Sequence, residues 1–159
     1  MGRRTYLVAG EQAVFSKTIT AEDIDAFAVI SGDHDPVHMD EAFARGTRFG
    51  RRIAHGALVM GLLSTTASIT SRRSVERGAA GTPVSVGYDR VRFTRPVFIG
   101  DTLTARYTVE EVDDAAGRTL SRVEVANQDG ALCLVGTHIL QWVQMADPPS
   151  PGTPTPSRG

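Results

Sequence analysis

One helical segment, apolar on nearly every side, constrains what this chain can fold into more than any other feature. The stretch 55–69 contains no Asp, Glu, Lys or Arg, and small residues recur along it at Gly61, Ser64 and Ala67. A helix with apolar residues all round is typical of a protein interior, because no side of it suits contact with water. The rest of the chain must therefore supply a surface that covers residues 56–70.

A long antiparallel sheet is the predicted cover, because the chain after Thr82 has the pattern of β-strands. Apolar residues alternate with polar ones in successive runs, which are residues 84–93, 103–109, 120–125 and 131–143. The alternation changes parity near Asp89, which predicts a β-bulge there. A first short strand is expected at 14–19, and His138 is expected to be a structural histidine. These elements predict an α+β domain whose sheet wraps around the single apolar helix.

Length and composition indicate one domain. The chain has 159 residues, of which 41% are hydrophobic and 22% are charged, as is ordinary for one folded unit. From residue 146 onward the chain holds five of its eight prolines and no large apolar residue, which predicts a disordered tail. We therefore place an N-terminal extension at residues 1–11, the domain at 12–145 and the tail at 146–159.

Charge and cysteine content exclude several functional classes. The formal net charge is −1, so no overall field would attract nucleic acid or an anionic membrane. Cys133 is the single cysteine, which excludes an intrachain disulfide, and its apolar surroundings predict a buried thiol. The N-terminal apolar stretch is too short for a signal peptide or a spanning helix. We expect a cytoplasmic protein with no nucleic-acid or membrane partner.

Local signals define the polar region that precedes the apolar helix. Thr20 and Asp23 have the spacing of a capping box, which predicts the start of a helix, and Gly32 is suited to end that helix in the left-handed conformation. Residues 33–39 are then expected to form a polar loop. The basic stretch 45–52 is predicted to be an exposed loop in which Arg51 and Arg52 are solvated charges, and the alternative is that one of them binds a ligand phosphate.

The most specific motif lies in residues 27–38, which read Phe-Ala-Val-Ile-Ser-Gly-Asp-His-Asp-Pro-Val-His. This segment resembles the hydratase-2 motif of the MaoC-like dehydratase family, which includes (R)-specific enoyl-CoA hydratases. In words, that motif is an aromatic residue, a small residue, then Gly-Asp-any-Asn-Pro-aliphatic-His. The resemblance continues at 53–56, Ile-Ala-His-Gly, and at 93–101 in the predicted sheet. It covers most of the chain and implies a hot-dog fold.

Asp33 and His38 match the acidic and histidine positions of this motif. A carboxylate and an imidazole that share one water supply the proton transfers that hydration of an enoyl thioester requires. Only five positions separate the two residues, and Pro36 stiffens the chain between them, so both side chains can converge on one point. The resemblance implies that Asp33 and His38 are the catalytic pair.

Other positions are implied to line the site. A helix N-terminus carries free N–H groups and a partial positive charge, and the resemblance places the Gly56 N–H there, against the thioester carbonyl. His55 and Ser64 match positions that line the family's site, although His55 also suits a capping or packing role and Ser64 suits close helix packing. Asp35 stands where the family has Asn, so an amide that can donate is replaced by a group that only accepts when ionised.

The resulting hypothesis is reversible hydration of a trans-2-enoyl-CoA to an (R)-3-hydroxyacyl-CoA, without a metal or redox cofactor and with coenzyme A only as part of the substrate. The alternatives are a dehydratase of a carrier-protein-bound 3-hydroxyacyl chain, a non-catalytic hot-dog subunit and an acyl-CoA thioesterase. A metal site within residues 33–38 is disfavoured, because no Cys or distant His completes a known pattern. Both parities of the last strand are apolar, so we expect a homodimer or a dimer of dimers to cover its outer face.

Overall fold

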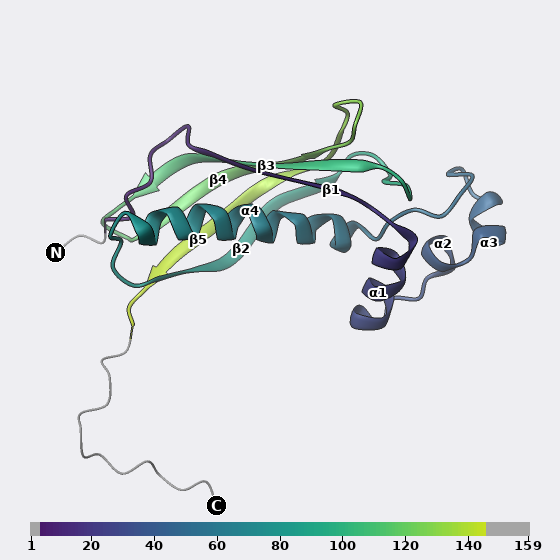
Figure 1. Ribbon diagram of the computed structural model, residues 1–159, viewed down its shortest axis with the longest axis horizontal. Helices are drawn as coiled ribbons and strands as arrows, with labels where there is room; N and C mark the ends of the chain where they lie inside the picture. The colour runs from purple at the N-terminus through teal and green to yellow at the C-terminus, as the bar shows by residue number, and fades with distance from the viewer. Residues whose placement is uncertain (1–3, 146–159) are drawn as a thin grey trace, which may run out of the picture.

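The structure, a computed structural model, describes residues 4–145 and places one long helix against one face of a curved sheet (Figure 1). In chain order its elements are β1 (Gln12–Thr18), α1 (Ala21–Ser31), α2 (Pro36–Met39), α3 (Glu41–Arg45), α4 (Gly56–Glu76), β2 (Thr82–Phe93), β3 (Thr102–Asp113), β4 (Arg118–Ala126) and β5 (Leu132–Val143). The strand order is β1-β3-β4-β5-β2, and all neighbouring strands are antiparallel. The predicted α+β hot-dog architecture is confirmed.

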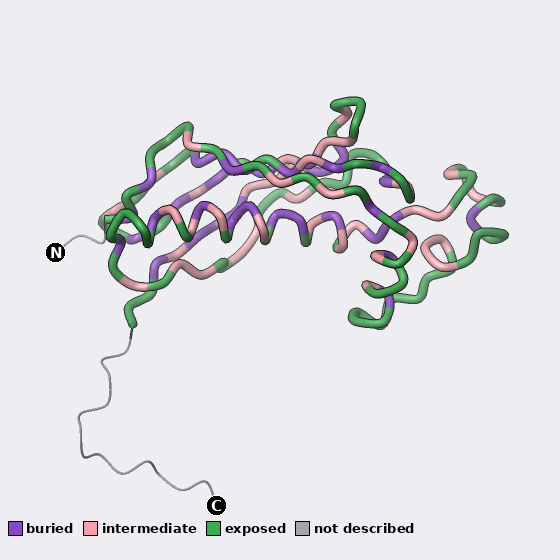
Figure 2. The backbone as a smooth tube through the Cα atoms, in the orientation of Figure 1, coloured by how far each residue is buried: buried purple, intermediate pink, exposed green. Residues whose placement is uncertain are grey.

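The core lies between α4 and the sheet. Leu63 of α4 is fully buried, and Leu103, Tyr107 and Trp142 of the sheet are at most 1% exposed. Figure 2 shows this burial along the side of α4 that faces the strands. The opposite side of α4 remains exposed, at Ala57, Gly61, Ser64 and Ser68. The expectation that this helix would be enclosed on every side is therefore wrong, because a single chain leaves this side of α4 uncovered.

The edge strand β2 is irregular at the predicted place. Its register against β5 shifts between Ser85 and Gly87 and again between Asp89 and Arg92. Arg90 lies in the second shift and has a φ of 54°, a conformation that a non-glycine residue adopts at a turn or bulge. The bulge predicted near Asp89 is confirmed.

The helices before α4 begin and end where their capping residues predict, with one addition. Thr20 and Asp23 form the expected capping box at the start of α1, and Gly32 ends that helix with a φ of 78°. The segment 33–39, predicted as loop, contains the short helix α2. Pro36 occupies the first turn of α2 and the Asp35 side chain accepts the Val37 N–H at 3.0 Å, a favourable helix start that the loop prediction overlooked.

Residues 4–11, set apart on the sequence as an extension, pack against the domain. Thr5 and Leu7 are buried. The Thr5 N–H donates to the Asp114 carboxylate at 2.7 Å, and the Ser74 hydroxyl donates to the Thr5 carbonyl. The folded unit thus begins before residue 12, whereas the predicted tail lies outside the described residues. None of the described helices is long and apolar enough to cross a membrane.

Strand β5 buries both of its faces within one chain. Cys133 and Leu134 are at most 1% exposed, and Ile139 and Leu140 are at most 7% exposed. Because curvature of the sheet already covers both parities, the apolar pattern of this strand does not require a second chain. Its exposed apolar residues are Leu132 and Val143, at its two ends.

Candidate active site

The helices α1, α2 and α3 form a cap beyond the N-terminal end of α4 (Figure 1). The motif residues Asp33 and His38 lie in this cap, and His55 and Gly56 lie at the junction between the cap and α4. In the described part of the chain, Asp33, His38 and His55 are one group whose ligand-type atoms all lie within 4.8 Å of one another. The two residues predicted as the catalytic pair are therefore brought together.

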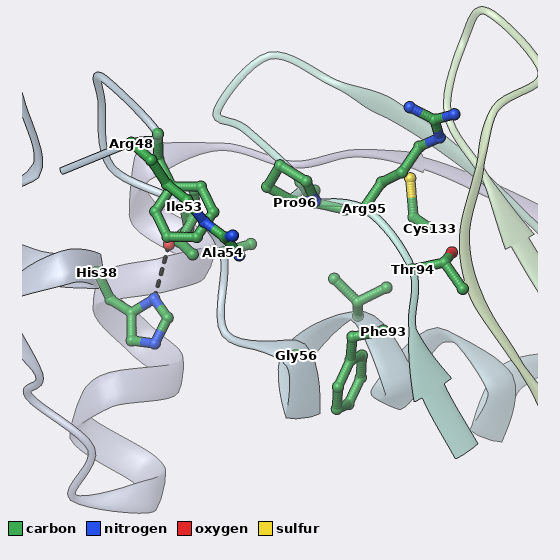
Figure 3. A pocket seen from close by; sticks show the side chains of 13 residues that line it. His38, Arg48, Ile53, Ala54, Gly56, Phe93, Thr94, Arg95, Pro96 and Cys133 are labelled. Atoms are coloured by element: carbon green, nitrogen blue, oxygen red, sulfur yellow. Dashed lines mark hydrogen bonds between the residues drawn. The ribbon is translucent and has the colours of Figure 1, made fainter. Parts of the chain in front are cut away.

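The ring of His38 is held in one orientation. Its Nδ1 lies 2.8 Å from the carbonyl oxygen of Ile53 (Figure 3). A carbonyl can only accept, so Nδ1 carries the proton of the neutral ring and Nε2 keeps its lone pair. The sequence places a histidine here, and the fold fixes which of its nitrogens can act as a base.

His55 packs between the predicted catalytic pair and α1. It is 2% exposed, its ring centroid lies 3.9 Å from that of His38, and Phe27 lies 4.9 Å away on α1. Its Nε2 lies 3.0 Å from the backbone carbonyl of Asp33, so Nε2 donates and Nδ1 is left as an acceptor. Nδ1 is buried and has no partner within residues 4–145. His55 thus contacts both members of the pair.

A cavity of about 250 Å³ lies beside His38 (Figure 3). It is lined by His38, Arg48, Phe49, Ile53, Ala54, Gly56, Val59, Phe93, Thr94, Arg95, Pro96, Val97 and Cys133. Gly56 is the first residue of α4, so its N–H has no acceptor inside the helix. A Cβ on Gly56 would lie 2.8 Å from the Phe93 ring. The absence of a side chain therefore lets the Phe93 ring lie directly against the start of α4, where both residues line this cavity.

Two of the predicted site residues lie elsewhere. Asp35 caps α2 through its side chain, as described above; like Asp33 and His55, it is not among the residues that line the cavity. Ser64 lines a second cavity of about 420 Å³, which runs along the exposed side of α4 and against Ser85 and Tyr88 of β2. The structure thus assigns Asp35 a local structural contact and separates Ser64 from His38.

Two arginines that the sequence did not single out line the cavity beside His38. Arg48 and Arg95 both face this space, and in the described part of the chain neither forms an ion pair. The guanidinium of Arg48 lies 5.0 Å from the centroid of the Phe49 ring. Arg95 belongs to the 93–101 motif, which was the one available signal for it.

Arg52 corrects the prediction that the 45–52 loop carries only solvated charges. Its side chain is 15% exposed and its Nη2 lies 2.6 Å from the Asp25 carboxylate. Its Nε donates to the carbonyl of His38. Sequence position alone does not reveal this role, because the partners of Arg52 come from two separate helices.

Comparison with known proteins gives consistent results. The family model described as a MaoC like domain matches residues 8–130. An (R)-specific enoyl-CoA hydratase from Aeromonas caviae is 31% identical over 135 residues, which cover 85% of this chain and 95% of that protein. The 3-hydroxyacyl-thioester dehydratase Z of Mycobacterium tuberculosis is 30% identical over 131 residues, covering 79% and 83% of the two chains.

Solved structures agree with this result. The A. caviae (R)-hydratase involved in PHA biosynthesis has a TM-score of 0.74 and 30% identity, covering 87% of this chain and 98% of that chain. The R-hydratase PhaJ1 from Pseudomonas aeruginosa, in its unliganded form, has a TM-score of 0.68 and 29% identity, covering 99% and 97%.

Proposed function

Because this chain belongs to the MaoC-like dehydratase family, we propose that it catalyses the reversible hydration of a trans-2-enoyl thioester to an (R)-3-hydroxyacyl thioester. The hydratase and dehydratase names of its relatives support this reaction and its class, a hydro-lyase. The observation that carries the proposal is the grouping of Asp33 and His38 beside the start of α4, where their ligand-type atoms lie within 4.8 Å of each other and the His38 Nδ1 bonds to the Ile53 carbonyl.

In the proposed mechanism, Asp33 and His38 hold one water between the carboxylate and Nε2. One of the pair takes a proton from the water as its oxygen bonds to the β-carbon, and the pair returns a proton to the α-carbon. The elements of water are added and no electron is gained or lost, so the step requires no redox cofactor. His55 supports the pair through its ring contact with His38 and its hydrogen bond to the Asp33 carbonyl.

Gly56 is proposed to stabilise the charge that develops on the thioester oxygen. As electrons move from the double bond toward the carbonyl, the oxygen becomes enolate-like. The N–H of Gly56 and the partial positive charge of α4 oppose that charge without any rearrangement of the protein. The 21-residue length of α4 gives the full dipole expected of a regular helix.

Coenzyme A is the proposed carrier of the acyl chain. Arg48 and Arg95 line the cavity and form no ion pair within residues 4–145, and guanidinium groups suit the phosphates of coenzyme A. The acyl chain is proposed to continue along the second cavity, where Ser64 would contact it. A carrier-protein-bound chain remains the second candidate, because dehydratase Z is named for a thioester without a stated carrier.

A homodimer is proposed on different grounds from those given by the sequence. The strand β2 lies at an edge of the sheet, where Val86 and Phe93 are more than half exposed, and the exposed side of α4 borders the same strand. A second copy that pairs at this edge would satisfy its backbone groups and cover both surfaces. The expected cytoplasmic location remains part of the proposal, supported by the free, buried thiol of Cys133.

The test is a hydration assay on trans-2-enoyl-CoA substrates of several chain lengths. The reaction is monitored as the loss of enoyl absorbance, in a buffer that contains EDTA. Asp33→Asn and His38→Ala, made separately, are expected to lower the rate by about a hundredfold or more, the scale of a general acid–base partner. The double variant should lose little more than either single variant, because the two residues share one water. A folded single variant that keeps near-normal activity would contradict its assignment.

The same assay separates the alternatives. The same acyl chain is supplied once on coenzyme A and once on a carrier protein. The substrate with the higher kcat/KM identifies the carrier. Release of free thiol from a saturated acyl-CoA would identify a thioesterase, which attacks the carbonyl carbon and not the β-carbon. A wild-type protein that acts on none of these thioesters would indicate a non-catalytic subunit.

A further inference from the structure

We propose that Arg52 is a positioning residue for the hydration step, acting through His38 and not on the substrate. The inference rests on the proposed function, because it takes His38 as one of the catalytic pair. It concerns a residue outside the matched motifs and outside the cavity lining. Its basis is the set of contacts that Arg52 makes with the cap.

Arg52 joins the three helices of the cap. Its Nε donates to the carbonyl of His38 in α2, and its Nη2 donates to Asp25 of α1 at 2.6 Å. Its backbone N–H donates to Glu41 of α3 at 3.3 Å. These partners are 11 to 27 residues away in the sequence. One residue thereby links three helices, of which α2 and α3 have only four and five residues.

Ile53, the residue after Arg52, connects these contacts to the imidazole of His38. Ile53 donates its N–H to the Val37 carbonyl at 3.3 Å, and its own carbonyl accepts from His38 Nδ1 at 2.8 Å. The backbone at 52–53 therefore holds both the carbonyl and the ring of His38. No residue of α2 is fully buried, so these hydrogen bonds, together with the ring contact to His55, set the direction of the His38 ring.

The chemistry of the side chain explains why an arginine is needed. A guanidinium presents planar N–H donors in fixed, divergent directions, so it can reach a carbonyl and a carboxylate at the same time. A lysine ammonium is a single point of charge. Asp25 is 53% exposed, and an ion pair with so exposed a partner contributes little to stability. The main effect of Arg52 is therefore geometric.

The experiment compares Arg52→Gln and Arg52→Lys with Arg77→Gln as a matched control. Arg77 also bonds a carboxylate, Glu11, and a backbone carbonyl, that of Tyr6, but it lies at the opposite end of α4. Both Arg52 variants are expected to lower kcat by about ten- to a hundredfold, because small misplacements of reacting groups have effects of this size. KM should stay within about threefold. Arg77→Gln should change melting temperature by a similar amount and leave kcat unchanged.

A second readout does not need turnover. The ¹⁵N NMR signals of the His38 imidazole report which nitrogen carries the proton, and the wild type should show the Nδ1–H form. Arg52→Gln should shift the signals toward a mixture of the two forms, whereas Arg77→Gln should not. This measurement tests the effect of Arg52 on the His38 ring even if the wild type hydrates no enoyl thioester. A lack of hydration activity would refute the proposed function and not the positioning role.

Two results would overturn the proposal. One is a folded Arg52→Gln protein with wild-type kcat. The other is an unchanged protonation pattern of the His38 ring in that variant. If Arg52→Gln does not fold, Arg52→Lys decides: a reduced kcat at unchanged KM supports the role, and a wild-type kcat refutes it.

Discussion

Acid is expected to destabilise this protein through one buried histidine, His138 of β5. Its side chain is fully buried, and desolvation lowers its pKa to about 4. Its Nδ1 lies 2.9 Å from the Tyr107 hydroxyl and its Nε2 lies 2.7 Å from the Ser85 hydroxyl. Burial also raises the pKa of Tyr107 to about 12, so the phenol keeps its proton. The neutral imidazole therefore accepts from one of these hydroxyls and donates to the other.

The size of the effect follows from the two states of His138. In the unfolded chain its pKa is about 6.5, so below that pH the unfolded chain binds a proton that the folded protein resists. The stability that depends on a neutral His138 is complete above about pH 6.5. It is lost as the pH falls toward about 4, the pKa of His138 in the folded protein. The total loss corresponds to about 3 kcal/mol, of which about 2 kcal/mol is already lost at pH 5.

The assay is urea unfolding of the wild type and of His138→Gln at a series of pH values between about 7 and 5, at constant ionic strength. A glutamine can likewise accept from one of the two hydroxyls and donate to the other, but it does not titrate. The other histidines contribute equally to both proteins. The difference between the two proteins in how the unfolding free energy changes with pH therefore isolates His138. The wild type should lose about 2 kcal/mol more than the variant over this range. Equal losses would show that His138 titrates normally and would refute the argument.

Two further predictions concern the site. Gly56→Ala should lower hydration at least about tenfold, because the new Cβ would meet the Phe93 ring at 2.8 Å and narrow the cavity. The unfolding free energy should change by less than about 1 kcal/mol, since Phe93 is 56% exposed and can turn outward. An unchanged kcat/KM for Gly56→Ala would argue against a catalytic role for the N-terminus of α4. Asp35→Asn should keep its activity, since Asn also caps helices, whereas Asp35→Ala should lose the bond to Val37 and about 1 kcal/mol of stability. Equal activity and melting temperature in both Asp35 variants would show that the cap is unimportant.

Features set by neighbouring residues were predictable from the sequence. The capping box at Thr20, the end of α1 at Gly32 and the bulge near Asp89 depend on local backbone chemistry, and each was expected. The alternation of apolar residues predicted the strands, because one face of each strand must be buried. The same local logic placed Gly56 at the head of the long helix.

Features that depend on distant contacts were not predictable. Arg52 looks like any arginine of a basic loop until the fold brings Asp25 and His38 to it. The separation of Ser64 from His38 depends on which side of α4 faces the sheet, and an apolar helix with small residues on several sides does not reveal that choice. The tautomer of His38 likewise depends on the Ile53 carbonyl, which the sequence does not locate.

The strand order has a consequence for synthesis on the ribosome. Strand β2 ends at residue 93, yet its partner in the sheet is β5, which begins at residue 132. During translation β2 emerges first and has no strand to pair with until the last described strand has left the exit tunnel. The hairpin of β3 and β4 can form in the interval, because those strands are adjacent in both sequence and sheet. Closure of the sheet over α4 is therefore a late event, and β2 remains without its partner strand while residues 94–131 are synthesised.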